Sequence, residues 1–311
     1  MRILVLGAGA IGGYFGGRLA ESGADVAFLV RAKRKAELEA RGLVVKSSFG
    51  DIACRVRALG PDEIDGPYDL VLLSCKSYDL DAAMGAIAPA AGPASAVLPL
   101  LNGLRHLDRL AERFGAERVL GGAAYIGAAL EGGEVRHIGG GHALVFGELS
   151  GGASPRAEAI RSVFARTKFD PRLAPDILRT MWEKLVMLAA LAAATTLTRA
   201  TVGEINAAPS GESFVLAALA ECAAVASAEH NAPSAAALDQ ARGLLTARGS
   251  RFAASMMRDL AAGRRTEADH VIGDLVRRAD RNGVAIPILR VALANLEVHE
   301  ARIAAAGAAG A

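Results

Sequence analysis

The first residues able to support chemistry are three glycines near the start of the chain, within the sequence Gly7-Ala8-Gly9-Ala10-Ile11-Gly12. A short apolar run before them is typical of a buried β-strand, and the stretch after them is typical of a helix. Glycines at this spacing let the chain turn tightly and let a pyrophosphate approach the helix N-terminus. The motif predicts a dinucleotide site. A glycine-rich turn that binds nothing is the alternative.

The kind of dinucleotide depends on the residues where the second strand ends. An acid there would bind the ribose 2′-hydroxyl of NAD(H), whereas cations accommodate the 2′-phosphate of NADP(H). This chain has Arg31, Lys33 and Arg34 at that point, and Asp25 stands at the opposite end of the strand. We therefore predict NADP(H), with Arg31 as the phosphate partner. A solvated basic turn is the alternative.

Two further polar residues follow later apolar runs. Lys76 comes just after the run 69–74, and Asn102 comes just after the run 96–100. If both runs are parallel strands, these side chains lie at the carboxyl edge of the sheet, where ligands bind. Asn102 can both donate and accept hydrogen bonds there. The alternatives are a surface lysine and an ordinary Asn-Gly turn.

These residues need a sheet to position them, and the first half of the chain predicts one. From Met1 to about Phe169, short apolar runs alternate with amphipathic stretches, which indicates parallel strands joined by helical crossovers. The expected strands are 2–7, 25–30, 43–46, 69–74, 96–100, 119–125 and 144–147, with helices at 10–22 and from about 79 and 104. After Lys168 the chain is alanine-rich with helical spacing. We expect an α/β domain over 1–173 and an all-α domain over 174–311.

Composition supports two domains and excludes several classes of partner. A chain of 311 residues exceeds the usual single domain of about 150 residues. Its 35 basic and 33 acidic side chains are too balanced for nucleic acid or an anionic membrane. The apolar stretches 185–197 and 214–228 fall short of a membrane span of about 18 uncharged apolar residues. We expect neither partner.

Cysteine and histidine spacing argues against disulfide and metal sites. The three cysteines Cys54, Cys75 and Cys222 form no Cys-x-x-Cys pair, so neither a disulfide framework nor a zinc site is indicated. The six histidines show no metal-binding spacing, and His137 and His142 flank a glycine turn. We expect no metal and a cytoplasmic location.

Taken together, these and later motifs resemble the ketopantoate reductase family, also called 2-dehydropantoate 2-reductases. The resemblance covers nearly the whole chain and runs through the glycine motif, Arg31, 75–76, 101–103, 182–185, 197–204, 255–256, 259, 263–269 and 283–287. It implies a Rossmann-type domain and an all-helical domain, with NADPH and a 2-keto acid meeting between them. It also implies hydride transfer to the ketone and a role in pantothenate biosynthesis.

The same resemblance assigns roles residue by residue. Lys184 matches the catalytic lysine, and Asn102 matches the asparagine beside the nicotinamide and substrate. Ser255 and Glu267 match the substrate pocket. Reducing a ketone leaves negative charge on oxygen, so a protonated donor such as Lys184 suits the chemistry. The alternatives are a lysine that reaches water from a helix end, an acid at a helix start for Glu267, and a bond to the backbone of its own helix for Ser255.

Three positions depart from the family pattern, which usually has asparagines where this chain has Leu188, Ala192 and Ile272. Leu188 lies one helical turn after Lys184, on the same face. We therefore expect Leu188 to form an apolar substrate wall and to disfavour the charged form of Lys184. The expected substrate is a bulkier or more apolar 2-keto acid than ketopantoate.

Two other functions remain open at this point. The lost asparagines also suit a non-catalytic NADPH-binding sensor that kept the nucleotide fold. A 3-hydroxyacid or imine-type dehydrogenase on a similar two-domain plan is a further possibility. The alanine-rich helices offer close-packing faces, so a homodimer is a further expectation.

Overall fold

A computed structural model describes residues 1–309 of the chain, with side chains placed through residue 306. The chain divides into two compact units. Unit 1 contains Met1–Asn102 and His106–Met181, and unit 2 contains Gly103–Arg105 and Trp182–Ala311. The sequence-based boundary at residue 173 precedes helix α6 (Ile177–Thr198), whereas the structural division falls within that helix.

Unit 1 contains a five-stranded parallel sheet with the strand order β5-β2-β1-β6-β7. Every residue of the two apolar strands β6 and β7 is buried, as expected for parallel strands covered on both faces. The strands are β1 (Arg2–Leu6), β2 (Asp25–Leu29), β5 (Arg57–Leu59), β6 (Leu70–Leu73) and β7 (Ala96–Pro99). The connecting helices are α1 (Ala10–Glu21), α2 (Ala32–Arg41), α3 (Leu80–Ile87) and α4 (His106–Phe114).

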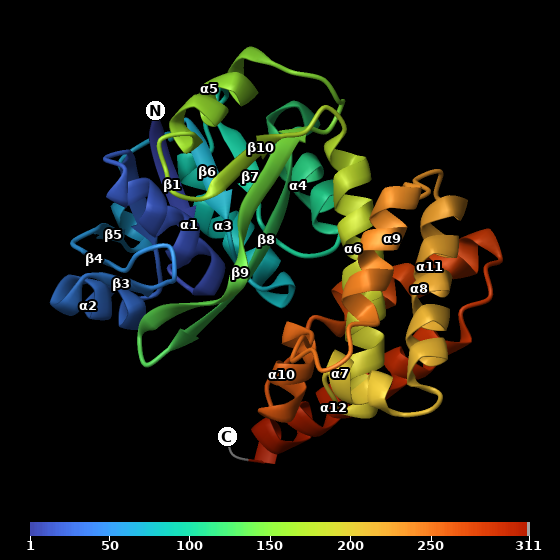
Figure 1. The fold of residues 1–311 in the computed structure, drawn as a ribbon. Helices are drawn as coiled ribbons and strands as arrows, with labels where there is room; N and C mark the ends of the chain where they lie inside the picture. The colour runs from blue at the N-terminus through green and yellow to red at the C-terminus, as the bar shows by residue number, and fades with distance from the viewer. Residues whose placement is uncertain (310–311) are drawn as a thin grey trace. The chain divides into compact units, whose positions relative to one another are not determined.

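The expectation of parallel strands as far as Phe169 is wrong for the second sheet of unit 1. Strands β8 (Leu120–Glu131) and β9 (Glu134–Glu148) pair antiparallel as a long hairpin, drawn in green in Figure 1. Gly132 and Gly133 form its turn with φ values of +56° and +85°, which favour glycine. The expected strands 119–125 and 144–147 cover only part of each observed strand, and the glycine turn expected between His137 and His142 is wrong, because those glycines lie within β9.

The remaining strands of the second sheet flank β9. The sheet order is β10-β9-β3-β4, with β8 paired to β9. Strands β3 (Leu43–Lys46) and β10 (Asp170–Leu173) run parallel to β9, and β4 (Ile52–Cys54) runs antiparallel to β3. The sheet is therefore mixed.

Helix α1 packs against strands of both sheets. Its residues Gly13 and Gly16 face Val135 and Phe28, where a Cβ atom would lie 2.7 Å from the neighbouring side chain in each case. The buried core around it also includes Phe146 of β9 and residues of α5 (Pro155–Phe164). This close packing holds the first turn of α1 in place behind the glycine motif.

Unit 2 is helical, as the sequence predicts. Besides the rest of α6 and a π-helical turn at Asp269–Gly273, it contains α7 (Val202–Ala207), α8 (Gly211–Ala228), α9 (Ala235–Leu245), α10 (Ser255–Ala261), α11 (Asp274–Asn282) and α12 (Pro287–Ala309). Buried alanines line α6 from Ala189 to Ala194, except for Leu191. Small side chains without rotamer entropy suit close helix packing.

The stretch 214–228, expected to fall short of a membrane span, belongs to the longer helix α8, which is the one helix among residues 1–309 that could cross a membrane by length and composition. It packs against α7, α9, α11 and α12. The Glu221 carboxylate on α8 accepts hydrogen bonds from the backbone N–H groups of Ile288 and Leu289, both at 2.9 Å, at the start of α12. Glu221 thus satisfies two N–H groups that a helix start leaves without backbone partners.

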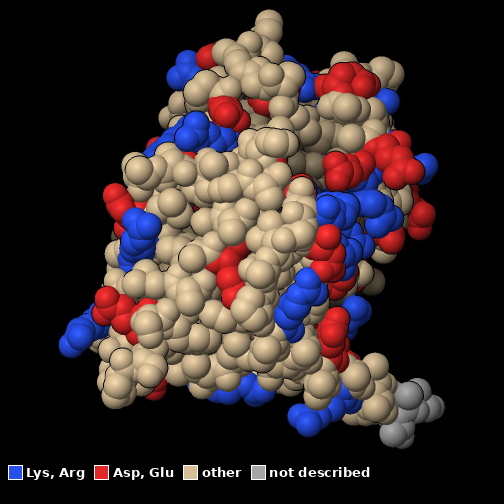
Figure 2. All heavy atoms as spheres, turned by 90° about the vertical axis from the view of Figure 1, so that its right-hand side faces the viewer, with Lys and Arg blue, Asp and Glu red and all other residues tan. Residues whose placement is uncertain are grey.

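Figure 2 shows one face of the molecule, on which basic and acidic side chains lie beside each other and broad areas between them carry few charges. A nucleic-acid surface requires a continuous run of cations to neutralise phosphates. The face in this view carries intermixed charges instead.

Candidate active site

The glycine motif forms the turn between β1 and α1. Gly7 has a φ of +89°, and Gly9 is the N-cap of α1. A Cβ atom at Gly12 would lie 2.1 Å from both the Gly7 carbonyl oxygen and Ser74 Oγ, so glycine is required there. A Cβ atom at Gly9 would instead meet nothing within 4 Å. The open space beside Gly9 therefore leaves room for a phosphate at the N-terminus of α1.

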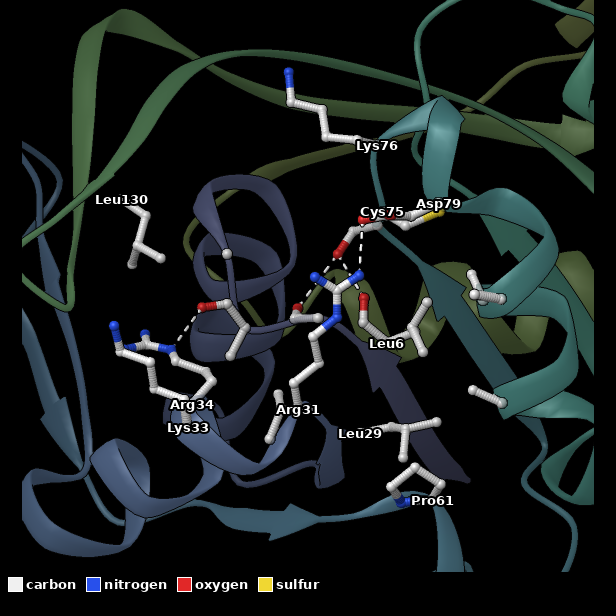
Figure 3. Close-up of a pocket in the computed structure, with 18 of the residues that line it drawn as sticks. Leu6, Leu29, Arg31, Lys33, Arg34, Pro61, Cys75, Lys76, Asp79 and Leu130 are labelled. Carbon is white, nitrogen blue, oxygen red and sulfur yellow. Dashed lines mark hydrogen bonds and ion pairs between the residues drawn. The ribbon is translucent and has the colours of Figure 1, made fainter. Parts of the chain in front are cut away.

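A cavity of about 570 Å³ lies beside this turn, within unit 1. Figure 3 shows its lining residues, many of which follow the carboxyl ends of β1, β2 and β6. The walls combine apolar side chains with charged ones: Leu6, Leu29, Pro61 and Leu130 with Arg31, Lys33, Arg34, Glu37, Lys76 and Asp79. Such a mixture, at this volume, suits a nucleotide ligand.

The predicted glycine-motif residues differ in their relation to the cavity. Gly7 and Gly9 line it. Ala10, Ile11 and Gly12 form the first turn of α1 and are not among its lining residues. Their backbone N–H groups belong to the helix start, which attracts anions.

Arg31, the predicted 2′-phosphate partner, is the N-cap residue of α2 and has a side chain that is 81% exposed. Its Nη2 donates a hydrogen bond to Asp79 Oδ2 at 2.9 Å. Asp79 ends the 3₁₀ turn Ser77–Asp79, which follows β6. The acid that reaches Arg31 thus comes from a different strand end, so inspection of the end of β2 does not reveal it. The sequence feature that could have revealed this acid is its position three residues after Lys76, near the carboxyl end of β6.

Arg34 is a cavity residue to which the sequence assigns no separate role. Its Nε donates to the Ala8 carbonyl oxygen at 3.1 Å, and its Nη1 donates to the Gly133 carbonyl oxygen at 2.9 Å and to Glu37 Oε2 at 3.0 Å. The side chain is only 14% exposed. Arg34 therefore ties the glycine motif to the turn of the β8–β9 hairpin, which also supplies Leu130 to the cavity wall.

Lys76 and Asn102 both follow strands of the parallel sheet, but only Lys76 lines the cavity. In Figure 3 the Lys76 side chain extends away from Arg31 and Asp79. Asn102 is partly buried and is the last residue of unit 1 before Gly103–Arg105, a segment that belongs to unit 2. Asn102 is therefore at a point where the chain passes from unit 1 to unit 2.

Lys184 lies on α6 in unit 2 and keeps only partial exposure. Loss of solvation lowers its pKa from 10.5 to about 8, and the negative charge of Glu267 opposes that lowering. An amine with a pKa near neutrality releases its proton more readily than a solvated lysine does. Two of the predicted site residues are thus close enough in unit 2 to interact electrostatically.

Glu267 and Ser255 occupy helix starts in unit 2. The Glu267 carbonyl oxygen accepts a hydrogen bond from the Val271 N–H at 3.0 Å, within the π-helical turn that follows it. This agrees with the helix-start reading of Glu267, and its side chain is still partly exposed. Ser255 is the first residue of α10 and is exposed. The π-helical turn has no signal in the sequence, and such turns are frequent at functional sites.

Of the three positions where the family usually has asparagine, only Leu188 keeps partial exposure. Ala192 is 3% exposed and Ile272 is fully buried. Both of those side chains are part of the packed interior of unit 2. Leu188, one turn after Lys184 on α6, is the one that can present an apolar surface to a small molecule.

Histidines of unit 1 have structural partners. His142 Nδ1 lies 2.9 Å from Tyr14 Oη, and its ring stacks on Phe49 at a centroid distance of 3.6 Å. His137 Nδ1 lies 3.0 Å from Ser47 Oγ. Across residues 1–309, no group of three or more His, Cys, Asp or Glu side chains is placed to hold a metal ion.

Known protein families match the sequence of both halves of the chain. A family model described as "Ketopantoate reductase PanE/ApbA" matches residues 3–151, and "Ketopantoate reductase PanE/ApbA C terminal" matches residues 176–300. The uncharacterized oxidoreductase YkpB of Bacillus subtilis is 35% identical over 97% of this chain and 99% of its own length. A 2-dehydropantoate 2-reductase of Halobacterium salinarum is 32% identical over 93% of this chain and 96% of its own length.

The fold is also found among solved structures. A PanE/ApbA family ketopantoate reductase from Ralstonia eutropha is 30% identical, with a TM-score of 0.88 over 97% of this chain and 99% of that one. Its fold confirms the expected parallel-sheet domain followed by a helical domain. On these matches, the chain belongs to the ketopantoate reductase family of oxidoreductases.

Proposed function

We propose that this chain is an NADPH-dependent reductase that converts a small 2-keto acid into a 2-hydroxy acid, in the manner of a 2-dehydropantoate 2-reductase. The observation that carries the proposal is the partly buried Lys184, whose pKa is lowered to about 8 and whose charge interacts with that of Glu267. When bound, NADPH supplies the hydride. The family membership and the cavity beside the glycine motif support the same reaction.

The cofactor proposal rests on features of unit 1. Gly7, Gly9 and the N-terminus of α1 would hold the pyrophosphate, because the space beside Gly9 is open and the helix start attracts anions. The exposed guanidinium of Arg31 would contact the 2′-phosphate. Lys76 lines the same cavity and would add a second cation.

The proton step is assigned to Lys184. Addition of a hydride to the carbonyl carbon moves an electron pair onto the oxygen, which must then be protonated. The Lys184 ammonium would donate that proton and become a neutral amine. Desolvation favours the neutral amine, while Glu267 keeps a large share of the charged acid near neutral pH. Asn102 would hydrogen-bond beside the nicotinamide and the substrate.

The substrate proposal rests on the face of α6 that carries Lys184. Leu188 follows one turn later and keeps exposed surface, so an apolar group of the substrate would pack there. Ser255 and Glu267 would hold the far end of the molecule. A site that lacks an amide for a substrate hydroxyl loses about 1–3 kcal/mol of selectivity for it. We therefore propose a more apolar 2-keto acid than ketopantoate.

Steady-state oxidation of NADPH across a graded set of 2-keto acids tests the proposal. The set contains ketopantoate, branched aliphatic 2-keto acids of increasing size, 3-oxo acids and a cyclic imine. Turnover that is fastest with an apolar 2-keto acid is the expected result. A clear preference for ketopantoate would contradict the apolar substrate and retain the reaction class.

The same assay separates the alternatives. Activity confined to 3-oxo acids or imines would select the other dehydrogenase class. Binding of NADPH without oxidation by any member of the set would select a non-catalytic sensor. A cytoplasmic location and a homodimer also remain predictions, and sedimentation equilibrium of the purified chain tests the dimer.

A further inference from the structure

The ion pair between Arg31 and Asp79 occupies the part of the cavity where the 2′ position of a bound dinucleotide is expected. The two side chains come from the N-cap of α2 and from the turn after β6, and both line the cavity. Their charged atoms lie 2.9 Å apart, and Figure 3 shows both residues among the labelled lining side chains.

Arg34, the other arginine that lines the cavity, has a structural role. Arg34 is 14% exposed and donates to two backbone carbonyl oxygens as well as to Glu37. Turning it toward a ligand would break the contacts that join the glycine motif to the β8–β9 turn. Arg31, at 81% exposure, can reorient at little cost, so of these two arginines only Arg31 is free to follow a 2′-phosphate.

The two nicotinamide cofactors differ at the group that this pair would meet. The 2′-phosphate of NADPH is an anion that must draw Arg31 away from Asp79 or share it, and the nearby carboxylate repels it. The 2′-hydroxyl of NADH is neutral and can donate a hydrogen bond to a carboxylate. Arg31 and Asp79 therefore favour opposite cofactors.

We propose that Asp79 is a specificity-determining residue that weakens NADPH binding relative to NADH by competing with the 2′-phosphate for Arg31. This inference rests on the proposed nicotinamide cofactor and assigns the residue that sets its preference. Asp79 then reduces the preference for NADPH over NADH that Arg31 alone would confer.

The test is titration of the full-length protein with NADPH and with NADH, followed by nucleotide fluorescence, so no substrate is required. Asp79→Asn keeps a hydrogen-bonding group beside Arg31 and removes its charge. We expect it to tighten NADPH binding by about 5- to 10-fold and to leave NADH binding unchanged or weaker. The gain should shrink as salt rises, because ions screen the repulsion at an exposed pair.

Asp81→Asn is the matched control. Asp81 lies two residues further on, is 73% exposed, pairs with Arg109 and does not line the cavity. The same loss of one negative charge should leave the ratio of NADPH to NADH affinity unchanged. Thermal unfolding of each variant confirms that the fold is retained.

The failures of the two proposals can be told apart. If the wild-type protein binds neither nucleotide, the cofactor assignment and the role of Asp79 are both overturned. If it binds NADPH and Asp79→Asn changes both affinities equally, or changes neither, only the role of Asp79 is overturned. An altered ratio in Asp81→Asn of the same size would also overturn it.

Discussion

In unit 1 the cavity residue Arg31 is 81% exposed and pairs with Asp79, whereas in unit 2 Lys184 is partly buried and has a pKa near 8. An exposed guanidinium keeps its charge at any physiological pH and can follow a ligand. A lysine that has lost solvent has an altered proton affinity instead. The comparison shows one cation suited to recognition and another suited to proton transfer.

The two units also differ in how they present their backbone. Unit 1 exposes a helix start and the open space beside Gly9, so main-chain N–H groups are available to a ligand. In unit 2, the start of α12 has two of its N–H groups satisfied by the Glu221 carboxylate. The proposed cofactor site in unit 1 therefore rests on backbone geometry, and the proposed proton donor in unit 2 rests on the surroundings of one side chain.

The largest expected effect comes from Lys184→Ala. Removal of the proton donor should lower kcat by about 10²- to 10⁴-fold, since that is the usual contribution of one general acid. NADPH affinity should stay unchanged because the cofactor residues belong to unit 1. Steady-state kinetics and fluorescence titration measure the two quantities. Lys168→Ala, an exposed lysine that pairs with Glu21, is the control and should retain full activity. An unchanged kcat in Lys184→Ala would remove this residue from the mechanism.

A second substitution should impair binding without disturbing the fold. Gly9→Ala places a methyl group in open space, so thermal stability should hold, but that methyl group meets an incoming pyrophosphate. Loss of charge-assisted backbone hydrogen bonds should weaken NADPH binding by about 10- to 100-fold.

Gly12→Ala is the contrasting variant for this prediction. Its Cβ atom would lie 2.1 Å from backbone and side-chain oxygens, so stability should fall by about 1–3 kcal/mol. Thermal unfolding and titration distinguish the two substitutions. Full NADPH affinity in Gly9→Ala would contradict the proposed pyrophosphate position.

The smallest expected effect concerns pH. Reduction needs the charged form of Lys184, so kcat/KM should fall by about tenfold per pH unit above a pKa near 8. Glu267 raises that pKa, so Glu267→Gln should start the decline at a lower pH. Glu212→Gln, an exposed acid at the start of α8, should leave the profile unchanged. A Glu267→Gln profile that matches the wild type would show that this charge does not act on the proton donor.

Much of unit 1 could be predicted because its signals are local. Apolar runs mark β1, β2, β3, β6 and β7 to within a residue or two, since the strand residues that face a buried core are apolar. The glycine motif marks the turn that follows β1, because the close approach of Ser74 at Gly12 leaves no room for a side chain. In unit 2 the alanine-rich sequence with helical spacing predicts helices. Gly283, with a φ of +65°, marks the end of α11.

Other features depend on contacts between distant segments. Arg31 and Asp79 form an ion pair although they are 48 positions apart in the sequence. The residues around either one do not predict this contact. The direction of the β8–β9 hairpin depends on one Gly-Gly turn, and the π-helical turn at Asp269–Gly273 has no marker. The burial of Ile272 and Ala192, in contrast to Leu188, likewise follows from packing.

By itself, the sequence determined the parallel sheet with its glycine turn, the helical second half and the family, because backbone conformation and strand burial restrict residue type locally. Only the tertiary structure decided which charges meet. It placed an acid beside Arg31 and lowered the pKa of Lys184 by removing solvent. Electrostatic energies depend on distance and on surrounding solvent, and both quantities exist only once the chain has folded.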